Sequence, residues 1–199
     1  MALDIELEVP TWDRIYEMLL NMAEKVCEDR FRPDILLGIS RGGLPPARVM
    51  SDLLENPEIA NVRVEFYVGV AETKKEPTIT QPVSMPVKGK KVLILDDVAD
   101  SGLSLRLVKE HVMKEGAEVA KTATIYYKPW SVTVPDYYEK ETRCWVVFPW
   151  ERKETVRWLV QNCRKESIPI EKGREKLLEG GLDRCLADRF LDEVAKEEL

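Results

Sequence analysis

The chain has 199 residues, of which 44% are hydrophobic and 33% charged, a composition typical of one soluble globular domain with or without an appendage. Its net charge of −6 argues against nucleic acid or an anionic membrane as the main partner, although local dipoles and single basic residues still permit an anionic small substrate. Because we find neither an apolar run of membrane-spanning length nor a secretory signal pattern, we expect a cytoplasmic protein.

The cysteines give little indication of a metal site. Cys27, Cys144, Cys163 and Cys185 are widely spaced without a C-x-x-C pair, and His111 is the single histidine. We therefore expect no zinc site and interpret the cysteines as buried, reduced thiols. His111 falls within a predicted helix, where a solvated or capping role is expected rather than a catalytic one.

The first predicted elements are a helix and a buried strand. Thr11 is placed to cap a helix whose apolar side chains follow 3,4 spacing and form a packing face: Trp12, Ile15, Leu19, Met22 and Val26. Pro33 ends this helix, and the apolar run 35–39 predicts a strand that is buried on both faces.

A short polar loop follows that strand and precedes a helix with two prolines in its first turn. Its residues are Ser40, Arg41, Gly42 and Gly43. Two glycines at this place allow backbone amides to approach an anion, and Arg41 supplies a forked donor for oxygens such as those of pyrophosphate. A plain tight turn would have the same appearance.

The middle of the chain gives weaker signals. Alternation of Val62, Val64, Phe66 and Val68 predicts a half-exposed strand. Residues 71–90 are rich in Thr, Lys, Pro and Gln without core periodicity, which indicates a surface β-hairpin or loop.

A second strand, loop and helix follow. Residues 92–95 are apolar without interruption and predict another fully buried strand, from which Asp96 and Asp97 leave the sheet at its carboxyl edge. Ser101 and Gly102 then open a helix with apolar residues at helical spacing, which are Leu105, Val108 and Val112.

This second loop suits a phosphorylated sugar. Free amides and the positive end of the helix dipole, with the hydroxyls of Ser101 and Ser104, would cradle a phosphate. The carboxylates of Asp96 and Asp97 would accept hydrogen bonds from a vicinal diol and hold Mg²⁺. The alternative is an acidic loop in which Ser101 is an ordinary N-cap. Against this alternative, the like charges of two adjacent carboxylates repel each other and favour neither a strand nor a turn without a bound partner.

The remaining elements complete an α/β pattern. Residues 118–127 are rich in β-formers and end at Lys128, and Tyr137 and Tyr138 are expected in a polar connection. Three helices are predicted in the tail: one around 156–163, one that ends at Gly180–Gly181, and one capped by Asp183.

The run from Val92 to Ser104 resembles the phosphoribosyl pyrophosphate (PRPP) signature of the type I phosphoribosyltransferases, with its acidic pair, Asp, Ser-Gly and Ser at the matching spacing. A Lys-Pro at 128–129 and a later Trp-aliphatic and Pro-Trp-acid segment at 145–151 are similar to the xanthine-guanine enzymes. The resemblance covers about residues 10–151. It implies a mostly parallel, doubly wound α/β sheet in residues 1–151 with a small hood at roughly 128–151. Residues 152–199 would be a helical extension that packs on the hood or on a neighbouring subunit.

The resemblance also implies an activity. A Mg²⁺-dependent purine phosphoribosyltransferase would transfer the 5-phosphoribosyl group from PRPP to guanine, hypoxanthine or xanthine, as a homo-oligomer of two or four subunits, with no nucleic acid or membrane as partner. PRPP would be bound by the two loops, namely Ser40, Arg41, Gly42, Gly43, Val98, Ala99, Asp100, Ser101, Gly102, Leu103 and Ser104. In the family the first loop often holds a non-proline cis peptide, and residues 71–90 fall where a flexible catalytic loop closes.

In addition to Asp96 and Asp97, five residues are expected to contact the base or the metal: Asp100, Lys128, Trp145, Val146 and Glu151. Asp100 matches the residue that contacts purine N7 as acid or base, and a role as an orienting acceptor fits the sequence equally well. Lys128 can only donate, which suits a 6-oxo group and opposes the amino group of adenine. Trp145 would stack on the purine, and the backbone of Val146 would meet its edge. Asp97 and Glu151 would contact metal.

Other functions fit parts of the pattern. A non-catalytic, nucleotide-sensing regulator with the same fold, or a phosphoribosyltransferase for another base, remains open. A P-loop hydrolase is excluded because no G-x-x-x-x-G-K-[ST] motif occurs.

Overall fold

The structure is a computed structural model that describes residues 5–55, 57–68 and 75–197. By its internal contacts the chain divides into two units, residues 16–142 and residues 1–15 with 143–199. The predicted division after residue 151 stays a prediction. In the structure, residues 128–142 group with the first unit, and residues 143–151 group with the helices that follow them.

The first unit contains a six-stranded sheet in the order β4-β3-β2-β5-β6-β7. All neighbours are parallel except β3 and β4, which are antiparallel. The strands are β2 (Ile35–Ser40), β3 (Glu58–Val68), β4 (Lys75–Gln81), β5 (Lys91–Ala99), β6 (Val119–Tyr127) and β7 (Tyr137–Glu141). The predicted α/β fold with a mostly parallel sheet is confirmed.

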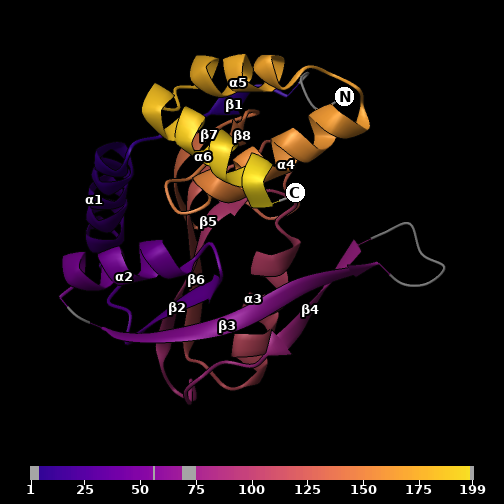
Figure 1. Ribbon diagram of the computed structural model, residues 1–199. Coiled ribbons are helices and arrows are strands. Elements are labelled where there is room, and N and C mark those ends of the chain that lie inside the picture. The colour runs from indigo at the N-terminus through magenta and orange to yellow at the C-terminus, as the bar shows by residue number, and fades with distance from the viewer. Residues whose placement is uncertain (1–4, 56, 69–74, 198–199) are drawn as a thin grey trace. The chain divides into compact units, whose positions relative to one another are not determined.

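Two helices of this unit cover opposite faces of the sheet, α2 (Leu44–Leu53) after β2 and α3 (Leu103–Lys114) after β5 (Figure 1). Because connections between parallel strands are right-handed, the chain turns to one face after β2 and to the other after β5. The carboxyl ends of these two neighbouring strands therefore form the switch point at which open α/β sheets bind ligands.

The core forms as the apolar patterns predict. The central strands β2 and β5 are buried on both faces of the sheet. Leu105, Val108 and Val112 of α3 pack against one of these faces. Helix α1 (Trp12–Glu28) begins where the sequence predicts, since the amide of Arg14 donates to Thr11 Oγ1 at 3.1 Å. The prediction that Trp12 belongs to the packing face of this helix is wrong, because 54% of its surface is exposed.

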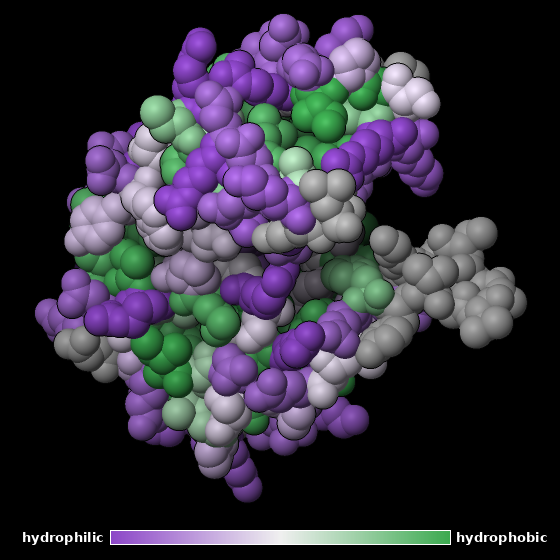
Figure 2. Space-filling model, in the orientation of Figure 1, coloured by the Kyte–Doolittle hydropathy of each residue, from purple (hydrophilic) through white to green (hydrophobic). Residues whose placement is uncertain are grey.

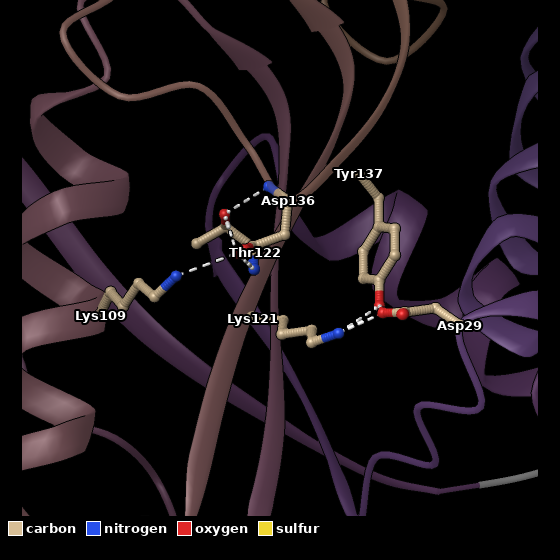
Figure 3. A network of polar contacts seen from close by, with 6 residues as sticks. All are labelled: Asp29, Lys109, Lys121, Thr122, Asp136 and Tyr137. Carbon is tan, nitrogen blue, oxygen red and sulfur yellow. Dashed lines mark hydrogen bonds and ion pairs between the residues drawn. The ribbon is translucent and has the colours of Figure 1, made fainter.

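Two polar clusters fix β6 and β7 to the helices (Figure 3). Asp136 accepts hydrogen bonds from the amide and hydroxyl of Thr122, at 2.7 and 2.9 Å, and from Lys109 of α3 at 3.0 Å. Just after α1, Asp29 accepts from Lys121 and from the hydroxyl of Tyr137. The hydrogen bond from Lys121 is the main reason why the pKa of Asp29 lies below its ordinary value.

Two strand features differ from the sequence prediction, and a third agrees with it. Tyr137 and Tyr138 belong to β7, an edge strand paired with β6, rather than to a polar connection. Strand β5 continues to Ala99, so Asp96 and Asp97 remain in the strand, because β6 is longer than β2 and pairs with Asp96, Val98 and Ala99 beyond the end of β2. The hairpin alternative for residues 71–90 is confirmed by the pairing of β4 with β3, and residues 69–74 lie outside the described residues.

The second unit joins a two-stranded sheet to three helices. Its elements are β1 (Leu7–Glu8), β8 (Trp145–Val146), α4 (Arg152–Lys165), α5 (Ile170–Glu179) and α6 (Arg184–Glu197). Leu159, Leu177 and Val194 contribute one buried side chain each from the three helices to its core. The predicted cap of the last helix is present, since the amide of Leu186 donates to Asp183 Oδ1 at 3.0 Å. Hydrophilic side chains predominate on the face of α6 shown in Figure 2.

The cysteines are only partly as predicted. All four are free thiols, but Cys27 and Cys185 are exposed and only Cys163 is fully buried. Cys27 lies near the end of α1 and Cys185 in the first turn of α6, where apolar periodicity does not require burial. Within residues 5–55, 57–68 and 75–197, we find no helix with the length and apolar character needed to span a bilayer.

Candidate functional site

The two predicted anion loops meet at the carboxyl ends of β2 and β5. A Cβ on Gly42 would lie 2.3 Å from Asp97 Oδ2, and a Cβ on Gly43 would lie 2.1 Å from the carbonyl oxygen of Leu95. Neither position has space for a side chain. The two glycines therefore let the loop after β2 lie directly against the acidic end of β5, which places both loops at one edge of the sheet.

Asp96 and Asp97 extend β5 beyond its last pair with β2, Gly38 with Leu95. Asp97 is only 8% exposed, and its amide donates to Asp96 Oδ1 at 3.0 Å. Burial, and then the like charge of Asp97, raise the pKa of Asp96 well above its ordinary value. A cation or a hydroxyl donor at this pair would relieve both effects.

The donor set at this edge fits Mg²⁺ in one specific way. In the described part of the chain, no three His, Cys, Asp or Glu side chains are grouped closely enough to hold a metal by themselves. Mg²⁺ usually keeps several waters and takes one or two carboxylates together with substrate phosphates. A pair such as Asp96 and Asp97 therefore suits an ion that arrives with a phosphorylated substrate.

The N-terminus of α3 is open to an anion. Its N-cap is Gly102, with a φ of 75°, and the cap makes no side-chain hydrogen bond. No acidic residue lies in the first turn of the helix. Gly102 has no side chain with which to cap the backbone amides there, and the dipole is not offset by a carboxylate in the first turn, so phosphate is a suitable partner. Ser101, the alternative N-cap, is instead one residue upstream, and its Oγ accepts from the amide of Leu103 at 3.4 Å.

The loop after β2 also leads into a helix N-terminus that has no side-chain cap. The Ser40–Arg41 peptide bond is cis, as the resemblance implied. Helix α2 begins after Gly43, again without a side-chain cap or an acidic residue in its first turn, and with prolines there. Arg41 is exposed in the loop between them. The amides of Gly43 and Leu44 donate to the carbonyl oxygens of Ile39 and Arg41, at 2.8 and 3.2 Å. The guanidinium of Arg41 is therefore the charged donor that this loop brings to the edge.

Lys128 follows β6 and lies beside the loop that joins β5 to α3. Its amide donates to the carbonyl oxygen of Ala99 at 3.0 Å, and the residue is 6% exposed. The ammonium lies 5.5 Å from the centroid of the Trp130 ring. Trp130 in turn donates from Nε1 to Asp100 Oδ1 at 2.9 Å. Sequence reasoning missed Trp130, because an exposed tryptophan after Lys-Pro carries no recognisable pattern.

The remaining predicted site residues belong to the second unit. Trp145 is 43% exposed, and its ring stacks on that of Trp158 in α4, with centroids 5.2 Å apart and planes at 19°. The amides of Trp145 and Val147 donate to the carbonyl oxygens of Glu6, just before β1, and Glu8, at 2.7 and 2.8 Å. Because backbone groups alternate along a strand, those of Val146 are directed to the opposite edge of β8.

Glu151 immediately precedes α4 in the second unit. Its Oε1 accepts a hydrogen bond from the amide of Phe148 at 3.4 Å. The structure thus brings together residues 40–43, 96–104 and 128 in one unit, and it places Trp145, Val146 and Glu151 in the other.

Comparison with known proteins gives consistent results. The family model described as "Phosphoribosyl transferase domain" matches residues 11–155. The xanthine-guanine phosphoribosyltransferase of Gluconobacter oxydans (strain 621H) is 32% identical over 143 residues, which cover 71% of this chain and 82% of that protein. That of Cereibacter sphaeroides (strain ATCC 17025 / ATH 2.4.3) is 31% identical over 149 residues, with 71% and 84% covered.

Solved structures share the fold. The crystal structure of a purine phosphoribosyltransferase from Pyrococcus horikoshii Ot3 is 39% identical, with a TM-score of 0.67 over 73% of this chain and 94% of that one. A hypothetical protein from Neisseria gonorrhoeae, solved with bound ppGpp, is 20% identical with a TM-score of 0.66, and it covers 95% of this chain and 97% of its own. The second similarity concerns the fold alone.

Proposed function

Because this chain belongs to the phosphoribosyltransferase domain family, we propose that it transfers the 5-phosphoribosyl group of PRPP to a 6-oxopurine, releasing pyrophosphate and a nucleoside monophosphate. Such a reaction salvages purine bases. The observation that carries the proposal is the contact of Gly42 with Asp97, which joins a loop suited to pyrophosphate to a strand end suited to ribose.

The phosphate groups are bound far from the reacting carbon. The 5-phosphate lies at the N-terminus of α3, held by the amides of residues 98–104 and the hydroxyls of Ser101 and Ser104. Pyrophosphate lies on the loop of Ser40, Arg41, Gly42 and Gly43. Binding at both ends fixes the anomeric carbon between them, so that binding energy is used to orient the reacting groups.

The acid pair acts on the ribose. Departure of pyrophosphate builds positive charge at the anomeric carbon, and the carboxylates of Asp96 and Asp97 stabilise that charge while they accept hydrogen bonds from the two ribose hydroxyls. Bound Mg²⁺ supplies charge neutralisation for the pyrophosphate. Asp97 would hold it at this edge, and Glu151 remains a prediction for a second contact.

The proposed base site contains Lys128, whose ammonium donates to the 6-oxo oxygen. Trp145 and Val146 belong to the other unit, and their stacking on the purine and contact with its edge remain predictions from the sequence. The names of the relatives, xanthine-guanine and purine phosphoribosyltransferase, support a purine of this class. Asp100 contacts N7 of the base, where it either exchanges a proton or orients the ring.

The test is pyrophosphate release by purified protein with Mg²⁺ and PRPP, offered guanine, hypoxanthine, xanthine, adenine, uracil and orotate one at a time. Release with a 6-oxopurine, and little with adenine or the pyrimidines, is the expected result. Release confined to orotate, uracil or adenine would assign another base. Tight PRPP binding with no release from any base would support the alternative of a nucleotide-sensing regulator.

Two further expectations concern the assembly and the metal. We expect a dimer or tetramer, which sedimentation velocity at micromolar concentration measures directly. We also expect release to stop when EDTA removes Mg²⁺ and to return when Mg²⁺ is added in excess.

A further inference from the structure

Trp130 is a large, exposed side chain at the edge of the candidate site, and no proposed step uses it. It is 52% exposed, yet its indole nitrogen donates to Asp100 Oδ1 at 2.9 Å, within the range of a charge-assisted hydrogen bond. We infer that Trp130 is a positioning residue, which orients the Asp100 carboxylate toward the base. This inference rests on the proposed function.

The backbone places the two residues opposite each other. Before Trp130, the amide of Lys128 donates to the carbonyl of Ala99 at 3.0 Å, and after it the amide of Val132 donates to that of Ser101 at 2.9 Å. The two acceptors, Ala99 and Ser101, lie directly before and after Asp100 in the chain. The two hydrogen bonds therefore bracket Trp130 and Asp100 and bring the indole within reach of the carboxylate.

A tight turn presents the indole. The amide of Ser131 donates to the carbonyl of Lys128 at 3.0 Å, which closes a four-residue turn with Pro129 at its second position, where proline is favoured. Trp130 occupies the third position. Since proline restricts the backbone of this turn, the ring is presented with little loss of conformational entropy.

Close packing holds the rest of this segment in place. Gly102 lies against it, because a Cβ there would be 2.3 Å from Ser131 Oγ and 2.7 Å from the amide of Thr133. At the far end, Asp136 is fixed by Thr122 and Lys109 (Figure 3). Water competes for a hydrogen bond to an exposed carboxylate, so this fixed backbone is what lets the indole compete successfully.

The ring also contacts the second polar group of the proposed base site. The Lys128 ammonium lies 5.5 Å from the ring centroid, within the range of a cation–π contact. One side chain thus contacts Asp100, proposed for N7, and Lys128, proposed for the 6-oxo oxygen. N7 and the 6-oxo oxygen belong to the same edge of a purine, so one residue that contacts both Asp100 and Lys128 can orient the two side chains toward that edge.

The test compares Trp130→Phe with Trp130→His. Phe keeps an aromatic ring and loses the donor, whereas Nε2 of His stands at the ring position of the indole nitrogen. At pH 8 the imidazole is mostly neutral and can donate from this atom. We expect kcat to fall about tenfold in Trp130→Phe, as for loss of a hydrogen bond to a charged group, with KM for PRPP within twofold. Trp130→His should recover most of the loss.

Two further variants separate positioning from general damage. In an Asp100→Ala background, Trp130→Phe should change kcat by less than twofold, because the indole has no carboxylate left to orient. Trp12→Phe replaces a similarly exposed tryptophan outside the proposed site and should leave kcat unchanged.

The outcomes distinguish this inference from the proposed function. Equal kcat in wild type and Trp130→Phe, or an equal loss in Trp130→Phe with and without the Asp100 carboxylate, would overturn the role of Trp130 and leave the enzyme assignment intact. A wild-type protein inactive with all bases would overturn both.

Discussion

Gly42 and Asp97 lie so close together that a Cβ on Gly42 would come within 2.3 Å of Asp97 Oδ2, although 54 residues separate them in the chain. The contact explains why the two anion loops form one site. It also makes Gly42 the position at which the proposed ribose and pyrophosphate sites are most sensitive to the addition of a single carbon atom.

Gly42→Ala should displace the Asp97 carboxylate and lower kcat/KM for PRPP by about 100-fold, the effect expected of a misplacement near 1 Å. Because a side chain can rotate away, the melting temperature should change little. Gly43→Ala is the contrast, since its Cβ would be 2.1 Å from a backbone oxygen, and it should lower the melting temperature as well. Full activity of Gly42→Ala would mean that Asp97 does not act where we place it.

Lys128→Met should change base selectivity. It keeps the length of the buried chain and removes the ammonium, so kcat/KM for hypoxanthine or guanine should fall about 10- to 100-fold. Any activity with adenine should remain or rise, because the opposing donor is gone. Parallel losses for both kinds of base, at an unchanged melting temperature, would contradict the contact with the 6-oxo group.

Asp136→Asn should weaken the fold in a pH-dependent manner. Burial raises the pKa of Asp136, but the hydrogen bonds from Lys109 and Thr122 outweigh burial, and the net pKa lies below its ordinary value. A carboxylate with a lowered pKa stabilises the fold above its unfolded pKa, about 3.9, and the contribution is lost as the pH falls through the folded value.

Urea unfolding of wild type and Asp136→Asn measures this effect. At pH 7 we expect the variant to be less stable by about 1 kcal/mol, a modest value because the carboxylate is partly exposed. The difference should shrink as the pH approaches 3. A difference that is constant between pH 7 and pH 3 would show that the ionised carboxylate is not what stabilises the fold.

Gly173→Ala tests the packing of the C-terminal helices. A Cβ there would lie 2.3 Å from Leu159 Cδ2 and 3.2 Å from Cys163 Sγ, between α5 and α4. Overpacking should lower the free energy of unfolding by about 1 kcal/mol or more, although alanine favours the helix. Differential scanning calorimetry measures the shift. A raised melting temperature would show that α4 and α5 separate easily at this point.

The elements that sequence predicts well are those in which pattern and packing agree. Val92 to Leu95 is continuous and apolar, and it forms a buried strand. Tyr137 to Glu141 has no such pattern and becomes a strand only because β6 offers it an unpaired edge. Asp96 and Asp97 stay in the sheet for a similar reason, since Thr124 and its neighbours in β6 pair beyond the end of β2.

The site was predictable where local motifs mark it. Residues 40–43 and 96–104 each combine glycine, hydroxyl or charged residues at a strand end, and the parallel sheet brings these ends together. The hydrogen bond of Trp130 to Asp100 spans 30 positions and arises from a turn that the folded sheet places, so no local pattern indicates it. Exposure of Cys27 and Cys185 likewise depends on which helix face is covered.

The measurement that tests the central claim most directly is the amount of nucleoside monophosphate formed from PRPP and a 6-oxopurine by wild type and by the Asp96→Asn/Asp97→Asn variant. We expect wild-type protein to form the product, and the variant to form it at least 100-fold more slowly at a similar melting temperature. Equal rates in the two proteins would contradict the assignment of this strand end as the place where the ribose reacts.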